Sequence, residues 1–417
     1  MAERSASPSP SSSSGSTAVT GSARRSAVLG AMFLMATSAI GPGFLTQTAT
    51  FTAQLGAAFA FAIVLSIIVD IAVQLNVWRV IGISGLRAHE LGNTVLRGAG
   101  WVLAALVVFG GMVFNIGNIS GTGLGLNAML GMDPVIAGII SAVLACVILL
   151  SKALGAALDK IVVALGLLMI VLTTYVAVSS RPPVGDALRN TVMPETVSFL
   201  GITTLIGGTV GGYITYAGAH RLLESGMTGV ENASGVARSS TFGIIVTGVM
   251  RVVLFLAILG VVVGGAQLDM TNPAGSAFEH ALGDTGRIVF GVVLWAASVT
   301  SVIGASYTSV SFMTSRTTSA RTVSILTIAF IAIGAVGYAT LGKAPATLLV
   351  FAGGFNGLIL PLGFTLVLWV AWRRRDLLQG YRYPAWLLVS GVLAWLLTLW
   401  LGWQSLSGLS KLWTGGL

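Results

Sequence analysis

Two short polar stretches interrupt otherwise apolar segments of the chain, and their side chains could bind a solute. In the first, hydroxyl and amide side chains follow the sequence Gly41-Pro42-Gly43: Thr46, Gln47, Thr48, Thr50, Thr52 and Gln54. Such groups are costly inside an apolar segment unless they face a cavity. We therefore expect this run to supply directional hydrogen bonds to a small polar molecule.

The second stretch is rich in glycine. It contains Gly207, Gly208, Gly211, Gly212, Tyr213 and Thr215. Four glycines within six residues can unwind a helix and free backbone N–H and C=O groups for a ligand. The alternative interpretation is that the glycines only let neighbouring helices approach closely, as small residues often do in membranes.

Asp70 and Arg251 are the ionisable residues predicted to lie deepest in the apolar segments. Charges in such positions are functional candidates by default. Asp70 could titrate or bind a coupling cation, or it could pair with Arg251, and the sequence leaves both interpretations open. Asn356 could line a pathway or hydrogen-bond between helices.

Other polar residues have simpler interpretations. His220 and Glu224 could form a gate or a proton relay, but a solvated helix end with an Arg221–Glu224 contact is the simpler prediction. His89 is predicted to lie in a loop. The single cysteine, Cys146, lies in an apolar run and is predicted to be a small core residue.

These residues must be positioned by membrane-spanning helices. Of the 417 residues, 55% are hydrophobic and 8% are charged, and the mean hydropathy is +0.92, too little polarity for a water-soluble globule. Apolar stretches of about 20 residues, long enough to cross a hydrocarbon core of about 30 Å, recur along the chain. They predict about eleven transmembrane helices, at 28–50, 57–80, 100–128, 133–151, 160–179, 199–220, 240–264, 286–313, 322–341, 345–371 and 385–406. The segments are continuously apolar rather than alternating, which excludes a β-barrel.

The net charge of +9 indicates topology rather than a nucleic-acid surface, because the basic residues are scattered between the predicted spans. With a cytoplasmic N-terminus, sixteen Lys and Arg residues fall inside and five fall outside. This asymmetry predicts a multi-pass protein of the cytoplasmic membrane with its N-terminus inside and its C-terminus outside. Residues 1–26 are predicted to be a disordered cytoplasmic tail.

The two polar stretches occupy the first helix of two five-helix blocks. This arrangement is typical of transporters built from inverted repeats, in which broken helices recur at equivalent positions. It predicts a first repeat at 27–180, an extracellular loop at 181–198, an inverted second repeat at 199–371, and an eleventh helix with the C-terminus at 372–417. The predicted fold class is therefore an all-α polytopic membrane protein with a 5+5 inverted repeat.

The chain after residue 27 resembles the Nramp (natural resistance-associated macrophage protein) superfamily. The matching segments are 41–45 in the first span, 115–122 with 126–127 in the third, 206–210 in the sixth and 360–362 in the tenth. The resemblance implies a leucine-transporter-like (APC) fold that works by alternating access. It also implies a substrate site where the first and sixth spans are broken.

Nramp proteins are proton-coupled importers of divalent metals such as manganese and iron, and this chain lacks the residues that the resemblance assigns to that chemistry. Counted from Gly41-Pro42-Gly43, the family's Asp-Pro-Gly-Asn falls on 52–55. The family's Met-Pro-His falls on 211–213, and the glutamine of its tenth span falls on Gly353. Its acidic pair in the third span becomes Asn115 and Asn118, which leaves the two as candidates for the transport pathway.

These replacements favour an organic substrate. A dehydrated divalent ion needs anionic or strongly donating ligands, and an asparagine cannot carry a proton as a carboxylate does. Backbone N–H groups at broken helix ends form a ready site for a carboxylate. A bacterial Nramp-like branch that shares these replacements is associated with 5-oxoprolinase-type genes, which makes 5-oxoproline a candidate substrate.

We therefore expect a secondary active transporter of a small organic acid or amino-acid derivative, coupled to a cation such as H⁺ or Na⁺. We expect no enzymatic activity, no cofactor and no resident metal, because no acid–base, nucleophile, zinc-binding or phosphate-binding arrangement stands out. One alternative is a transporter of Mn, Fe or Mg with an altered site, and another is a membrane receptor. The sequence does not indicate the oligomeric state.

Overall fold

The structure is a computed structural model that describes residues 41–315 and 317–415. In these ranges the chain is helical, and the helices are α2 (Pro42–Leu55), η1 (Gly56–Ala58), α3 (Phe59–Ser84), α4 (Ala88–Val95), α5 (Ala99–Leu130), α6 (Pro134–Leu150), α7 (Lys152–Ser179), α8 (Val184–Asn190), α9 (Phe199–Thr209), α10 (Ile214–Glu224), η2 (Val230–Asn232), α11 (Ala233–Val263), α12 (Pro273–Met313), α13 (Ala320–Leu341), α14 (Pro345–Arg373) and α15 (Ala385–Gly415). The predicted tail at 1–26 and the start of the first predicted span lie outside the described residues.

The helices confirm the predicted pattern of membrane spans. Eight helical segments of the described ranges are long and apolar enough to cross a membrane, and the first of them contains both α2 and α3. The shorter apolar helix α6 and the interrupted pair α9 and α10 complete the series. Each of the eleven predicted spans therefore has a helical counterpart among residues 41–415.

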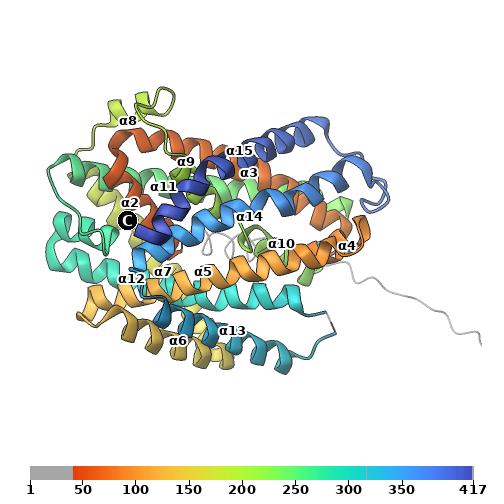
Figure 1. Ribbon diagram of the computed structural model, residues 1–417, viewed down its shortest axis with the longest axis horizontal. Coiled ribbons are helices and arrows are strands. Elements are labelled where there is room, and N and C mark those ends of the chain that lie inside the picture. The colour runs from red at the N-terminus through yellow and green to blue at the C-terminus, as the bar shows by residue number, and fades with distance from the viewer. Residues whose placement is uncertain (1–40, 316, 416–417) are drawn as a thin grey trace, which may run out of the picture.

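The long helices run side by side as a bundle, which Figure 1 shows in side view. The short helix α8 and the C-terminal end of α15 lie at one end of the bundle, and α4 lies at the other (Figure 1). The loop at 181–198, which contains α8, and the C-terminus were both predicted to be extracellular. Their common position agrees with the prediction that the two lie on the same side of the membrane.

The outside of the bundle is apolar. Large hydrophobic side chains on its peripheral helices are exposed, including Val171 on α7, Ile333 on α13 and Trp403 on α15. An apolar surface of this extent is a liability in water, whereas in a bilayer it matches the lipid chains. The inner helices α9 and α14 instead bury most of their side chains against each other and against α2, α3 and α5, and α11 buries about half of its side chains against α2, α3 and α7.

Candidate functional site

The first interruption lies at the start of α2. Gly41 is extended (φ −78°, ψ −175°), and Pro42 is the first helical residue. Proline is favoured there because its fixed φ suits a helix and its missing N–H would have no helical partner. The polar run that follows is regular helix rather than unwound chain. Thr48 donates to the Phe44 carbonyl (2.8 Å) and Thr52 to the Thr48 carbonyl (2.6 Å), so α2 itself uses these two hydroxyl protons.

The rest of this predicted run divides into buried and exposed residues. Thr46, Gln47 and Thr50 are buried, and the Thr50 hydroxyl has no hydrogen-bond partner. Gln54 is exposed near the end of α2, about 20 Å along the helix from Gly41. The structure therefore does not bring Gln54 to the interruption, since 13 residues of helix separate it from Gly41.

Gln47 connects the first interruption to α14. Its amide nitrogen donates to the Leu349 carbonyl at 3.0 Å. The same amide fills the space beside Gly353, where a Cβ atom would collide with it, and it also lies against Gly208 of α9. Gln47 thus holds α2, α9 and α14 together, and one of its amide protons is already used.

The second interruption separates α9 from α10 at residues 210–213. Gly212 has a left-handed backbone (φ 53°), and a Cβ atom at this position would collide with the Asn356 side-chain oxygen. Gly211 and Gly212 therefore lie where the sequence predicts an interruption. Gly207 and Gly208 instead belong to the regular helix α9, and Gly207 packs directly on the backbone of α14. For Gly207, close helix packing is the better interpretation.

Polar atoms without partners gather beside the second interruption. The side chain of Asn118 on α5 lies beside the Tyr213 hydroxyl, and the Phe114 ring packs edge-on against the Tyr213 ring at 5.4 Å. Asn356 donates to the Gly110 carbonyl (3.0 Å), which joins α14 to α5. The amide nitrogen of Asn118 and the side-chain oxygen of Asn356 are buried and have no partner. Both can bond a solute at the interruption.

Two other predicted residues point elsewhere. Asn115, one helical turn from Asn118, donates to the Phe330 carbonyl of α13 at 3.4 Å and lies against Gly334. Thr215 is buried in α10, where its carbonyl accepts from the Trp78 indole at 2.9 Å and its hydroxyl has no partner. Asn115 therefore lies against α13, and Thr215 lies one residue inside α10.

Asp70 and Arg251 form a buried pair behind the second interruption. Arg251 Nη1 lies 3.8 Å from Asp70 Oδ2, and it donates to Ser66 Oγ at 2.8 Å. The Thr209 hydroxyl, at the last residue of α9, lies 2.6 Å from the same Asp70 oxygen. The Arg251 guanidinium also lies 5.0 Å from the centre of the Phe44 ring on α2. Of the two interpretations that the sequence left open, the structure shows the pair.

Sequence reasoning missed several members of this cluster. Ser66 lies four residues before Asp70 on α3, so the i, i+4 spacing could have placed both on one helix face. Thr209 and Phe44 carried no such signal, because their contacts depend on how α2 and α9 pack. The predicted loop residue His89 lies in the helix α4, and Glu224 pairs with Arg87 instead of Arg221.

Comparison with known proteins identifies the family. A family model described as natural resistance-associated macrophage protein-like (Nramp) matches residues 32–407. The chain belongs to the Nramp family. An uncharacterized membrane protein of Haemophilus influenzae is 52% identical over 369 residues, which cover 88% of this chain and 92% of that protein.

Solved structures show the same fold in this Nramp protein. A variant of the Eremococcus coleocola manganese transporter superposes with a TM-score of 0.74 at 15% identity, over 96% of this chain and 90% of that one. MhsT in complex with L-phenylalanine superposes with a TM-score of 0.61 at 15% identity, over 90% of this chain and 98% of that one. The chain is thus a polytopic membrane protein with the leucine-transporter-like fold of membrane transporters.

The structure favours a different register for the first-span motif. Counting from Gly41-Pro42-Gly43 put the family's Asp-Pro-Gly-Asn on 52–55, but residues 52–55 are the last turn of α2. The interruption lies at Gly41, and a Pro-Gly pair follows it directly. A motif placed on 41–44 would keep its proline and glycine, as Pro42 and Gly43. In this register Gly41 replaces the carboxylate and Phe44 replaces the amide.

The donors at the two interruptions are neutral in the described part of the chain. By its resemblance to the family, the chain has Gly41, Phe44, Gly211 and Gly353 in place of an aspartate, an asparagine, a methionine and a glutamine. Residues 41–315 and 317–415 contain no group of three or more His, Cys, Asp or Glu that could hold a metal ion. The groups that remain are amides, hydroxyls and backbone, which suit hydrogen bonding to an organic solute.

Proposed function

We propose that this Nramp protein is a secondary active transporter of a small organic acid or amino-acid derivative, with 5-oxoproline as a candidate. The observation that supports this substrate class is the replacement of four ligand positions by Gly41, Phe44, Gly211 and Gly353. Gly41, Gly211 and Gly353 have no donor side chain that could bind a metal ion. The amide nitrogen of Asn118 and the side-chain oxygen of Asn356 have no partner and remain available as hydrogen-bonding groups.

The helix ends at the interruptions favour an anionic group on that solute. α2 begins directly after Gly41, so its first N–H groups have no partner within the helix. The start of a helix also carries a partial positive charge, which attracts a carboxylate and repels a metal ion. Asp70 adds little negative charge to the site, because it is paired with Arg251.

The proposed mode of transport is alternating access. Residues 27–180 and 199–371 form the two inverted repeats, and they expose the interruptions to each side of the cytoplasmic membrane in turn. The N-terminus lies inside and the C-terminus outside. A cation such as H⁺ or Na⁺ drives the transport, and Asp70 is the buried carboxylate that would exchange its arginine for that cation.

Transport of a divalent metal is the second candidate function. It is favoured by the family itself and by the shared fold with the manganese transporter of Eremococcus coleocola. In that case backbone carbonyls, hydroxyls and amides would hold a largely hydrated ion such as Mg²⁺. The two candidates differ in the charge of the cargo, so a single assay separates them.

Uptake into proteoliposomes that contain the purified chain is that assay. We expect uptake of labelled 5-oxoproline or a related organic acid above protein-free liposomes, without uptake of Mn²⁺ or Mg²⁺. Competition by a panel of unlabelled acids and amino-acid derivatives then ranks the substrates. Uptake of Mn²⁺ or Mg²⁺ in the absence of any organic-acid flux would contradict the proposal and favour the metal.

A further inference from the structure

A polar cavity of about 510 Å³ lies at the far end of α10 from the second interruption. Arg87 and Glu224 line it, together with hydroxyl side chains of α12, α13 and the link between them, among them Tyr307, Ser311 and Thr314. We call it the Arg87 cavity. It is large enough for a solute of about ten heavy atoms and several waters.

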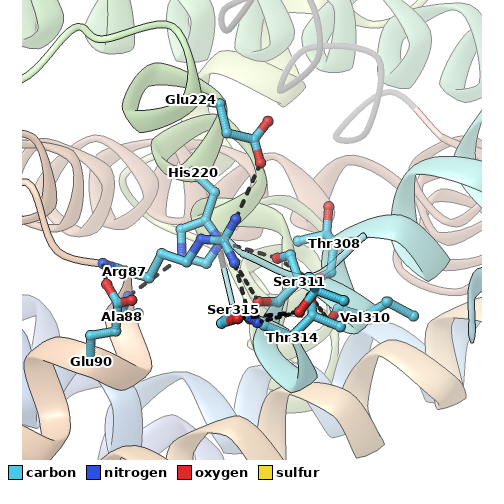
Figure 2. Close-up of polar contacts among 11 residues, drawn as sticks. Arg87, Ala88, Glu90, His220, Glu224, Thr308, Val310, Ser311, Thr314 and Ser315 are labelled. Atoms are coloured by element: carbon cyan, nitrogen blue, oxygen red, sulfur yellow. Dashed lines mark hydrogen bonds and ion pairs between the residues drawn. The ribbon is translucent and has the colours of Figure 1, made fainter. Parts of the chain in front are cut away.

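Arg87 is buried and held in place by three parts of the fold. Its backbone N–H donates to Glu90 Oε2 (2.7 Å), which fixes the start of α4. Its guanidinium Nη1 donates to the carbonyls of Ser311 (3.1 Å) and Thr314 (3.2 Å) at the end of α12. Figure 2 shows the guanidinium between these carbonyls and the carboxylate of Glu224. The result is a fixed cation in the cavity wall.

Glu224 holds Arg87 only loosely. Arg87 Nη2 lies 3.6 Å from Glu224 Oε1, beyond a direct hydrogen bond, and the Glu224 side chain keeps 34% of its surface exposed. Glu224 is the last residue of α10, so its side chain can move without disturbing the helix. An incoming carboxylate can therefore take a bidentate position on the guanidinium while Glu224 swings into the cavity.

Three hydroxyls of the wall offer acceptors rather than donors. Ser311 donates to the Thr308 carbonyl (2.6 Å), and Thr314 donates to the Val310 carbonyl (2.9 Å). Thr327 likewise donates to the Val323 carbonyl at 2.8 Å. Because each of these three protons is used within its own helix, the three hydroxyls can only accept from a ligand. The Ser311 oxygen already lies 3.2 Å from His220 Nδ1, so Thr314 and Thr327 offer the more available oxygen lone pairs. This wall suits N–H groups on a solute that also carries a negative charge.

The cavity lies between the second interruption and one surface of the membrane, at the end of α10. Tyr213 lies at the second interruption and Glu224 at the other end of α10, about 16 Å away by helical rise. Arg79, Arg87 and Arg221 all lie at this end, which the distribution of basic residues assigns to the cytoplasm. The cavity is thus separate from the interruptions and borders the helix that leads from them.

We propose that the Arg87 cavity is a second solute site on the arginine-rich side of the membrane, which binds a molecule that carries both a carboxylate and an N–H donor. Arg87 binds the carboxylate, and Glu224 with the hydroxyl oxygens accepts the N–H. A divalent cation is disfavoured, because it must compete with Arg87 for the only carboxylate among the described lining residues. The inference rests on the proposed transport of organic acids and adds the requirement for an N–H group.

Binding to the full-length chain in detergent, measured by isothermal titration calorimetry, tests this site with three related probes. 5-Oxoproline carries both groups, cyclopentanecarboxylate carries only the acid, and 2-pyrrolidone carries only the lactam N–H. In Glu224→Ala the N–H acceptor is lost and Arg87 loses its competitor for both acids. We expect cyclopentanecarboxylate to bind more tightly and the ratio of the 5-oxoproline affinity to the cyclopentanecarboxylate affinity to fall at least tenfold. A purely structural role of Glu224 would leave that ratio unchanged.

Two further variants complete the test. Arg87→Ala is expected to abolish binding of both acids at this site, and Arg87→Lys, which keeps the charge and is the milder change, should weaken it. Arg375→Ala, an exposed arginine of the link before α15, is the matched control and should leave every affinity unchanged. If 5-oxoproline binds equally to the wild type and to all variants, the second site is refuted while organic-acid transport stands. If the wild type binds Mn²⁺ and none of the three probes, both proposals fall.

Discussion

The carboxylate of Asp70 on α3 and the guanidinium of Arg251 on α11 lie 3.8 Å apart, and both side chains are almost completely buried. The pair contacts both interrupted helices, because Arg251 lies on the Phe44 ring of α2 and Asp70 bonds Thr209 of α9. An isolated charge at this depth would be very costly. The pair therefore allows two charges to fix the positions of α2 and α9.

Removal of one charge should destabilise the protein more than removal of both. Asp70→Asn leaves Arg251 buried without a counter-charge, which costs about 3–5 kcal/mol in comparable buried pairs. The double variant Asp70→Asn/Arg251→Gln leaves two neutral groups and should recover most of this loss. Thermal unfolding in detergent measures the difference. A double variant that is less stable than Asp70→Asn would contradict this account of the pair.

Gly212 should be essential for reasons of space as well as backbone conformation. Gly212→Ala places a methyl group against the Asn356 side-chain oxygen in a left-handed backbone, so we expect the α9–α10 interruption to be displaced and transport to be lost. Gly342→Ala is the matched control, since Gly342 has a similar φ of 60° and open space around it. Both variants carry the same type of backbone strain. If both variants lose proteoliposome uptake equally, backbone strain alone explains the effect and the contact of Gly212 with Asn356 has no special role.

The register at Gly41 can be tested by restoring the family's ligands. In Gly41→Asp/Phe44→Asn a carboxylate and an amide return to the start of α2, and we expect Mn²⁺ binding to appear. The control Thr52→Asp/Leu55→Asn places the same two groups in the other register, in the last turn of α2, and should not bind Mn²⁺. Calorimetric titration with Mn²⁺ distinguishes the two variants. Mn²⁺ binding by the control alone would show that the motif falls on residues 52–55.

The sequence predicted the helices well because each is long and continuously apolar. It also located both interruptions, since Gly41-Pro42-Gly43 and the Gly211-Gly212 pair cannot continue a regular helix without cost. It did not show that the polar run after Gly43 is helical. Thr48 and Thr52 each donate to the carbonyl four residues earlier, which lowers the cost of burying their hydroxyls inside α2. Hydropathy alone does not reveal such hydrogen bonds.

Contacts between helices account for the remaining differences. Gly207 was expected to unwind the chain, but the backbone of α14 packs on it, and a contact of this kind depends on the arrangement of two distant helices. The Arg87–Glu224 pair was missed for the same reason, because 137 positions separate its partners in the chain. Local spacing suggested Arg221 for Glu224, whereas the fold places Arg87 beside it.

The stability of the protein should depend on pH through His89, which lies on the short helix α4 outside the membrane spans. Burial lowers the pKa of its imidazole, with Glu90 opposing and Arg87 adding to the effect. Its ring lies near the rings of Trp101 (6.1 Å) and Phe312 (5.8 Å), so the neutral form is the one that fits.

The sign follows from proton uptake. When the pH falls below the ordinary histidine pKa of about 6.5, the unfolded chain binds a proton that the folded chain does not bind. The free energy of unfolding therefore decreases as the pH falls. The loss continues until the pH reaches the lowered folded-state pKa. His89→Gln should therefore flatten the fall in melting temperature between about pH 7.5 and 5.5. The exposed His280 on α12 provides the control, because its replacement should keep the wild-type slope. An unchanged slope in His89→Gln would show that another group causes the acid sensitivity.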